Sequence, residues 1–277
     1  MTKLSPQQLS FFETFGYLAF PGLLSDCIDE ITDAFEEIWV QHGGGHNGKL
    51  HDGTARSVLV PFIDQHEWLC TLLDNPRIEG VLASILGDDF NYLSSDGTFF
   101  NSDMRWHHDS SKEKPRYAKT AIYLDPLTRD TGALRVIPGS HHLNDPYGKA
   151  LQANLKFSEE SWSIAGRDVP CVALETQPGD VLIFNHRIKH ASYGGGQRRR
   201  MFTLNCSEHH AAHELDDLRF YISAYGRFWI DRMLGPLMVE TASPRRMVHL
   251  EQVMAHDGHL SALSAKSRME QPEPARW

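Results

Sequence analysis

The strongest constraint on the fold of this chain is a series of short β-rich segments between about residue 90 and residue 207. Each segment is rich in β-branched and aromatic residues, and Gly, Pro, Asp and Ser separate one segment from the next. The segments are FNYLSSDGTFF, YAKTAIYLDPL, GALRVIPGSHH, CVALETQPGDVLIFNHR and RRMFTLNCS. Short strands with closely spaced turns are typical of a sandwich or a barrel. We therefore expect this region to form a β core.

Helical patterns lie on both sides of the β region, in residues 1–90 and 213–265. Ser5 is followed by a Pro at the first helical position and by Gln8 at the third, a variant of the capping box. Ser25 is expected to cap a second helix, and a third amphipathic helix is expected near 65–86. The predicted fold class is α+β, with a single domain over 1–277, a β core at about 90–207 and helices at both ends.

Composition and charge exclude several classes of function. The 277 residues carry a formal net charge of −9, so the basic surface that binds nucleic acid or an anionic membrane is not expected. No apolar run approaches the ~18 residues of a transmembrane helix, and the N-terminus lacks the apolar core of a signal peptide. The four cysteines are far apart and form no CxxC pair, which favours reduced thiols. We expect a soluble, cytoplasmic protein without a nucleic-acid or membrane partner.

Three further segments bear on the binding site and on assembly. The glycine-rich stretch GGGHNGK, at 43–49, is expected to be a mobile loop, and the wider segment 43–57 is expected to help shape the pocket. The polar segment 143–168 is long for a loop in a compact domain, a property that favours a role in binding or disorder. The segment FYISAYGRFWIDRML, near 219–234, either joins the core or forms a homodimer interface.

The stretch RWHHDSS, at 105–111, combines two imidazoles with a carboxylate. Alternate residues of a strand share a face, so His107 and Asp109 are expected to point the same way and His108 to point away. One nitrogen and one oxygen ligand suit Fe, Mn or Zn better than a soft metal. Arg105 is expected on the same face, where it either meets an anionic group of a substrate or is a solvated arginine at the rim. The motif alone is weak, and it needs a third ligand from elsewhere in the chain.

A second group of polar residues follows the buried strand VLIF, in the sequence NHRIKHASYGGGQRRRMF. His186 and His190 both qualify as the third ligand. Three arginines then enter the next strand, and an arginine suits a carboxylate that chelates the metal, because its planar fork pairs with a carboxylate in bidentate fashion. Strand alternation points Arg199 opposite to Arg198 and Arg200, so a register shift of one residue would exchange their positions.

In this combination and order, the residues resemble the phytanoyl-CoA dioxygenase (PhyH) family. The resemblance rests on the His-x-Asp pair at 107–109, the GALRVIPGSHH segment, the PGD turn with His-Ala-Ser at 190–192, and an arginine in the following strand. The opening LSPQQLSFFETFGYLAFPGLL is also similar, and the resemblance covers roughly residues 5–207. Members of this family are Fe(II)- and 2-oxoglutarate-dependent oxygenases. The resemblance therefore implies a double-stranded β-helix (jelly-roll, cupin-like) core with flanking helices.

The resemblance also implies a metal site. His107 and Asp109 match the first two iron ligands of the family, and His190 matches the distal histidine, because the family places that histidine directly before a small residue and a serine. His186 remains the rival third ligand. The carboxylate at position 109 argues for hydroxylation or another oxidation, since related halogenases replace it with a small residue.

A cosubstrate site is implied in the same way. Arg199 matches the arginine that pairs with the far carboxylate of 2-oxoglutarate, and Ser192 matches a hydroxyl that helps to hold the same group. Lys119, in YAKTAIYL, fits a further contact to the cosubstrate.

The implied activity is an Fe(II)-, 2-oxoglutarate- and O2-dependent hydroxylation of an unactivated C–H bond in a small polar metabolite, with release of succinate and CO2. Two other classes of function remain open on the residues alone. One is a jelly-roll metalloenzyme of another class, such as a Zn- or Mn-dependent isomerase or hydrolase. The other is a non-catalytic metal-binding module.

Overall fold

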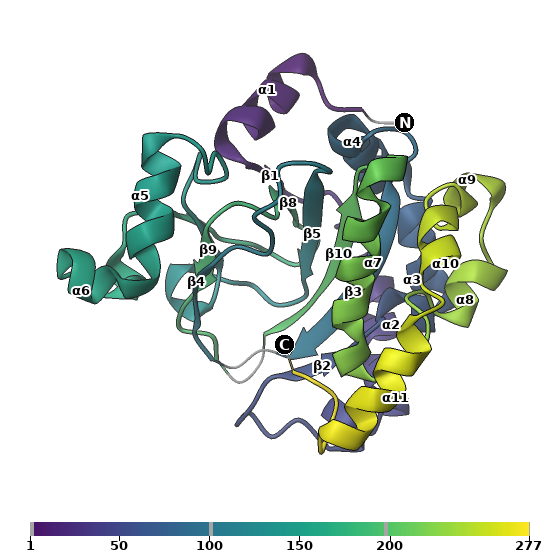
Figure 1. Cartoon of the computed structure of the whole chain (residues 1–277). Coiled ribbons are helices and arrows are strands. Elements are labelled where there is room, and N and C mark those ends of the chain that lie inside the picture. Colours follow the sequence, from purple (N-terminus) through teal and green to yellow (C-terminus); the bar gives the residue numbers. More distant parts are fainter. Residues whose placement is uncertain (1–2, 100–101, 197–198, 277) are drawn as a thin grey trace.

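The computed structural model describes residues 3–99, 102–196 and 199–276, and its strands form two antiparallel sheets (Figure 1). The six-stranded sheet has the order β1 (Tyr17–Phe20), β8 (Val181–Asn185), β5 (Tyr117–Tyr123), β10 (Arg200–Ser207), β3 (Asn91–Phe99) and β2 (Ser57–Leu59). The four-stranded sheet has the order β4 (Met104–His107), β9 (His190–Ser192), β6 (Leu134–Val136) and β7 (Val172–Leu174). This arrangement confirms the predicted α+β class with a jelly-roll core.

Helices cover the outer faces of the two sheets. Before the β core lie α1 (Pro6–Phe15), α2 (Ile28–Gln41), η1 (His46–Gly48), η2 (Ile63–Gln65), α3 (Glu67–Cys70), η3 (Thr71–Leu73) and α4 (Pro76–Leu86). After it lie η7 (Ala212–Glu214), α7 (Leu215–Ser223), η8 (Ala224–Phe228), α8 (Pro236–Glu240), α9 (Pro244–Met247), α10 (Glu251–His256) and α11 (Leu260–Glu270). Within the core, η4 (Arg129–Thr131) precedes β6. In Figure 1 the C-terminal helices pack beside β3 and β10.

Strand alternation separates two layers of the interior. On β10, Phe202, Leu204 and Cys206 are buried in the large core between the six-stranded sheet and the helices. Met201 and Thr203, from the opposite face of the same strand, line a cavity between the sheets. The interior of the jelly roll is therefore left with room for polar side chains and ligands.

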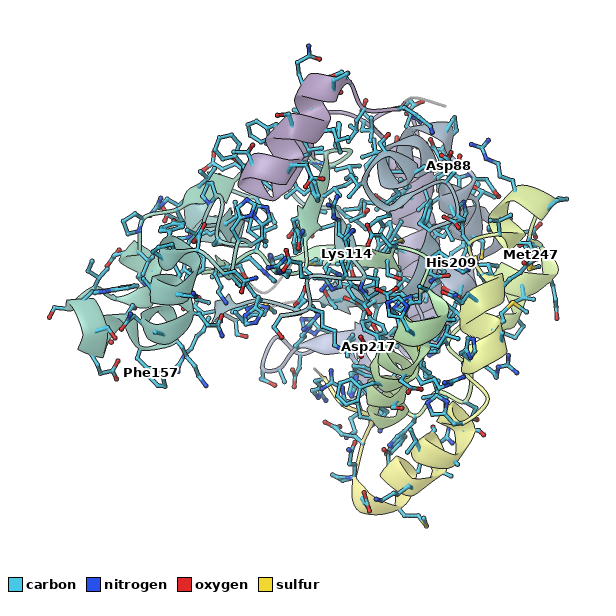
Figure 2. The ribbon with its side chains drawn as sticks, turned by 45° about the horizontal axis from the view of Figure 1, so that its top comes forward. Asp88, Lys114, Phe157, His209, Asp217 and Met247 are labelled. Carbon is cyan, nitrogen blue, oxygen red and sulfur yellow. The ribbon has the colours of Figure 1, made fainter. Side chains whose placement is uncertain are left out.

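The segment 143–168 is a helical insertion, made of α5 (Pro146–Asn154), η5 (Leu155–Phe157), α6 (Ser158–Trp162) and η6 (Gly166–Asp168). It packs on the four-stranded sheet through a separate cluster of apolar side chains, which includes Leu151, Leu155 and Trp106. Figure 1 shows α5 and α6 on the outer side of β4 and β9. In Figure 2, Phe157 lies on this insertion, on the opposite side of the molecule from Met247. The expected loop is thus an ordered wall beside two strands.

The N-terminal helices agree with the sequence in part. The capping box at Ser5 and Gln8 is present as predicted. Ser25 does not cap α2, because its hydroxyl donates to the Gly22 carbonyl and Cys27 occupies the N-cap position. The prediction of a single helix near 65–86 is wrong. Asn75 caps a new helix, α4, whose first residue is a proline.

The region 1–90 is mostly helical, and it also contributes β1 and β2 to the six-stranded sheet. The glycine-rich loop at 43–49 contains His46, whose ring nitrogens lie 3.0 and 2.9 Å from the carbonyl oxygens of Val58 and Pro274. The aromatic segment near 219–234 contributes Ile222, Tyr225 and other side chains to the main core. Within the described residues, the helices are all too short or too polar to cross a membrane.

Candidate metal centre and cosubstrate cavity

Antiparallel pairing of β4 with β9 places His107 directly opposite His190. Two histidines that are far apart in sequence thereby become neighbours, with ring centroids 4.1 Å apart. Asp109 lies just beyond the end of β4, where its backbone N–H donates to the His186 carbonyl oxygen at 2.8 Å. The sheet register and this one turn bring the three predicted ligands together.

The three side chains offer their ligand atoms to a common point. The Asp109 Oδ1 atom lies 3.8 Å from Nε2 of His107 and 3.8 Å from Nε2 of His190. The Nδ1 atoms face backbone carbonyl oxygens instead. Nδ1 of His107 lies 2.8 Å from the Arg105 carbonyl oxygen, and Nδ1 of His190 lies 3.0 Å from that of Ile188. Each Nδ1–H is thus placed to donate, which leaves both Nε2 lone pairs for a metal. Two imidazoles and one carboxylate on one face match the donor set of non-haem Fe(II) oxygenases.

Electrostatics keep all three groups in the protonation state that binds metal. Burial lowers the pKa of His190 to about 3, and it also lowers the pKa of His107, so both rings are neutral at pH 7. Burial alone would raise the pKa of Asp109, but nearby positive charge, above all the Lys119 ammonium, outweighs burial and holds that pKa well below its usual value. Asp109 is therefore a carboxylate across the physiological range.

Lys119, which is expected at the cosubstrate, contacts one of the three candidate ligands. Its Nζ atom is 2.8 Å from Asp109 Oδ2, the oxygen that does not face the two histidines. Lys119 comes from β5 and also lines the cavity beside the three ligands. The structure thus places Lys119 in contact with a ligand carboxylate, at the metal end of this cavity.

The cavity has a volume of about 210 Å³ and lies between the sheets. Ser192 and Arg199, the residues expected at the cosubstrate, line it, and each is 3% exposed. The Arg199 guanidinium carbon lies 5.2 Å from the ring centroid of Tyr123, within cation–π range. The flanking Arg200 instead binds Asp125 and Glu36 away from the cavity. Arg198, the other flanking arginine, lies outside the described residues.

His186, the rival ligand, has a different environment. It is buried, its ring stacks against Tyr117 with centroids 5.6 Å apart, and burial lowers its pKa to about 4. The structure does not bring it into the group formed by His107, Asp109 and His190. Its backbone carbonyl, which accepts the Asp109 N–H, positions the ligand loop.

The predicted face of Arg105 is wrong. A β-bulge lies between Met104 and His107, where three steps along β4 match two along β9. The extra residue breaks the alternation, so Met104 rather than Arg105 lines the metal cavity with His107. Arg105 is exposed and lines a second cavity on the other side of His107.

Sequence reasoning missed Arg56. This residue directly precedes β2 and lines the metal cavity. Burial lowers its pKa to about 10, partly against the charge of Asp96, so it remains a cation. It belongs to a glycine-rich loop with no motif, and only the general expectation that this loop shapes the pocket pointed to it.

Solved structures share the fold at low sequence identity. The carbocyclase SnoK from nogalamycin biosynthesis is 20% identical, with a TM-score of 0.56 over 74% of this chain and 84% of its own. HygX from Streptomyces hygroscopicus, with nickel and 2-oxoglutarate bound, is 16% identical, with a TM-score of 0.58 over 74% and 88%. EctD from S. alaskensis, with 2-oxoglutarate and 5-hydroxyectoine, is 20% identical, with a TM-score of 0.56 over 74% and 76%.

No curated protein sequence matches the chain. The sequence profile of the family described as Phytanoyl-CoA dioxygenase (PhyH) matches residues 12–201, which is more than half of the chain. The protein therefore belongs to the PhyH family and is a non-haem dioxygenase that uses Fe(II) and 2-oxoglutarate.

Proposed function

We propose that this dioxygenase hydroxylates an unactivated C–H bond of a small polar molecule, with Fe(II) held by His107, Asp109 and His190. The observation that carries the assignment is the convergence of two Nε2 atoms and one carboxylate oxygen beside a cavity. A metal ion held by only these three side chains would keep coordination positions free for cosubstrate and O2.

The charges of the cavity support 2-oxoglutarate as its occupant. Arg199, Lys119 and Arg56 contribute three cationic side chains to its wall, against the two carboxylates of Asp96 and Asp109. A metal dication held by the three candidate ligands would add to this excess of positive charge, and a dianion with a carboxylate at each end would complement it. We assign the far carboxylate to Arg199 and Ser192. Lys119, which already touches Asp109, is assigned to the metal end of the cosubstrate.

The net reaction balances as substrate, O2 and 2-oxoglutarate giving hydroxylated substrate, succinate and CO2. Bound Fe(II) supplies the activation of O2, coupled to oxidative decarboxylation of 2-oxoglutarate. The residues of the chain bind and orient: the carbonyls opposite each Nδ1 fix the imidazoles, and the buried cations fix the cosubstrate. Substrate must then approach from a side that Arg199 and the cosubstrate leave open.

The test compares two histidine variants in iron binding and in turnover. His190→Ala should lose Fe(II) binding and the conversion of 2-oxoglutarate to succinate, because it removes one of three ligands. His186→Ala is the matched control, and it should still bind Fe(II). The reverse outcome would show that His186 is the ligand. Turnover with Zn(II) or Mn(II) and no succinate with Fe(II) would favour the isomerase or hydrolase class instead.

A further inference from the structure

A second cavity, of about 660 Å³, meets the metal centre at His107, which lines both cavities. Its walls come from β4, from Tyr193 just after β9, and from the η5–α6–η6 part of the helical insertion. The volume lies within the range of sites for small molecules. The His107 side chain is 36% exposed, so this cavity opens directly onto a predicted metal ligand.

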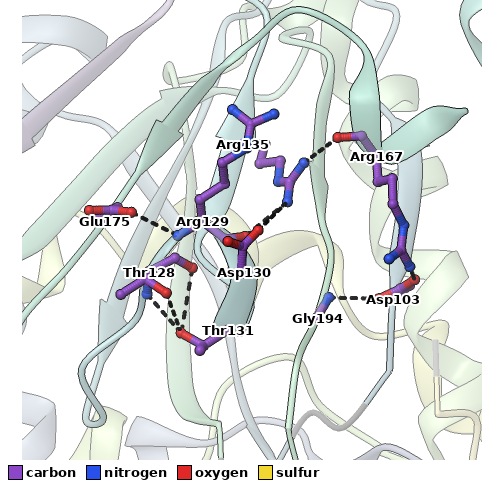
Figure 3. A network of polar contacts seen from close by, with 9 residues as sticks. All are labelled: Asp103, Thr128, Arg129, Asp130, Thr131, Arg135, Arg167, Glu175 and Gly194. Atoms are coloured by element: carbon purple, nitrogen blue, oxygen red, sulfur yellow. Dashed lines mark hydrogen bonds and ion pairs between the residues drawn. The ribbon is translucent and has the colours of Figure 1, made fainter. Parts of the chain in front are cut away.

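The insertion that closes this cavity is fixed to the strands by a polar network (Figure 3). Arg167 binds Asp103 at 3.2 Å, and Asp103 in turn accepts the Gly194 N–H at 2.8 Å. The buried Arg135 guanidinium donates to the Arg167 carbonyl at 2.5 Å. The wall is therefore preorganised around the metal centre.

Aromatic side chains supply the apolar surface of the cavity. Trp106 is only 6% exposed, and its Nε1–H donates to the Gly166 carbonyl at 2.7 Å, so the indole is locked. The Arg135 guanidinium lies 5.0 Å from the ring centroid of Tyr193 and holds that ring in place. Phe157, from the insertion, is 54% exposed and has room to cover a ligand.

The charged residues of the cavity differ in whether they are already paired. Arg167 is paired with Asp103, but Arg105 and Lys156 have no carboxylate partner within the described part of the chain. The bulge in β4 is what turns Arg105 toward this cavity. Glu159 and Glu160, on the insertion, also line the cavity and oppose the accumulation of negative charge there. A ligand with a single negative charge fits this balance better than a dianion.

We propose that this second cavity is the substrate site and that it selects small organic acids. The carboxylate of the substrate binds Arg105, whose fork suits a carboxylate, with Lys156 as a second cation. The apolar body lies against Trp106, Phe157 and Tyr193, and its far end reaches the metal past His107. This inference rests on the proposed function, and it adds the substrate class.

The experiment measures binding of matched ligands to the anaerobic Fe(II)–2-oxoglutarate holoenzyme by calorimetry. The ligands are ω-phenylalkanoates of increasing chain length, with their primary amides and the corresponding amines. At least one acid should bind tenfold or more tightly than its amide and its amine. Arg105→Gln should weaken binding of that acid about tenfold and leave its amide unchanged, and Arg105→Lys should restore part of the difference.

Arg219→Gln is the matched control, since Arg219 is an exposed arginine on α7 that pairs with Asp216 outside both cavities. It should keep the acid preference of the wild type. Equal affinity for acid and amide, tighter binding of an amine, an acid preference unaffected by Arg105→Gln, or no binding by any acid would overturn the carboxylate site. The 2-oxoglutarate complex and its succinate formation are measured in parallel. If they are intact, only the substrate class fails, whereas their absence would overturn the proposed function as well.

Discussion

The two carboxylate oxygens of Asp109 face different partners. Oδ1 lies 3.8 Å from both histidine Nε2 atoms, whereas Oδ2 lies 2.8 Å from Lys119 Nζ. Lys119 is therefore a positioning residue in addition to its assigned role at the cosubstrate. The Lys119 ammonium at the second oxygen fixes the orientation of the carboxylate and would limit it to one bond with a metal.

Lys119→Met should weaken Fe(II) affinity roughly 10- to 100-fold, the range seen when partners of ligands are removed. The pKa of Asp109 should also rise, because the largest opposing charge is lost. Fe(II) binding by the variant should consequently fail at a higher pH than in the wild type when the pH is lowered. A titration with Fe(II) at several pH values measures both effects, and an unchanged affinity and pH profile would contradict the positioning role.

Residues in motifs were the predictable part of the site. His107, Asp109 and His190 were found from spacing and resemblance, and the structure brings their ligand atoms together. Arg56 carried no such signal, because it reaches the cavity from a loop. The position of Arg105 could not be predicted, since one additional residue in β4 reverses its face and the sequence does not mark a bulge.

At the scale of elements, the insertion 143–168 depends on its own small apolar cluster. Leu155 is 4% exposed within that cluster and separate from the main core. Leu155→Ala should cost about 2–5 kcal/mol locally. Hydrogen exchange should accelerate across 146–169 while the amides of β10 stay protected, because the two regions share no apolar cluster.

The same variant tests whether the two cavities bind different ligands. Leu155 lines the second cavity but not the metal cavity. Binding of 2-oxoglutarate should therefore survive the substitution, while binding of organic acids weakens. Equal acceleration of exchange in β10 would show that the insertion is part of the global folding unit.

Helices and loops were predictable where the local sequence signals agreed with the packing of the folded chain. The capping box of α1 formed as expected. The helix expected over 65–86 failed, because apolar periodicity continues through Asn75 while the following proline starts a new helix. The polar composition of 143–168 suggested a loop, yet a few apolar contacts with β4 and β9 suffice to order it.

At the scale of the whole molecule, buried neutral histidines link stability to pH. His141, His186 and His210 have pKa values lowered by burial to about 4, and His190 to about 3. The unfolded chain takes up these protons near its ordinary pKa of about 6.5, before the folded state does. The metal-free protein should therefore lose stability as the pH falls from about 6.5 toward 4, by up to ~1.4 kcal/mol per pH unit for each histidine.

Urea unfolding of the metal-free protein at pH 7.5 and pH 5 measures this loss. Asp64 opposes this loss of stability. Burial raises the pKa of its carboxyl to about 6, so the folded state takes up this proton before the unfolded state and gains stability as the pH falls. His141 lies outside the metal centre. His141→Asn should make the free energy of unfolding less dependent on pH, by the contribution of one histidine. A free energy of unfolding that is equal at both pH values would contradict this account.

The central claim is that one Fe(II) ion binds His107, Asp109 and His190 and faces 2-oxoglutarate in the adjacent cavity. A crystal structure of the anaerobic Fe(II)–2-oxoglutarate complex tests it most directly. We predict one metal ion bound by the two Nε2 atoms and a single oxygen of Asp109, with the far carboxylate of the cosubstrate at Arg199. A metal bound through His186, or 2-oxoglutarate bound away from Arg199, would contradict the account.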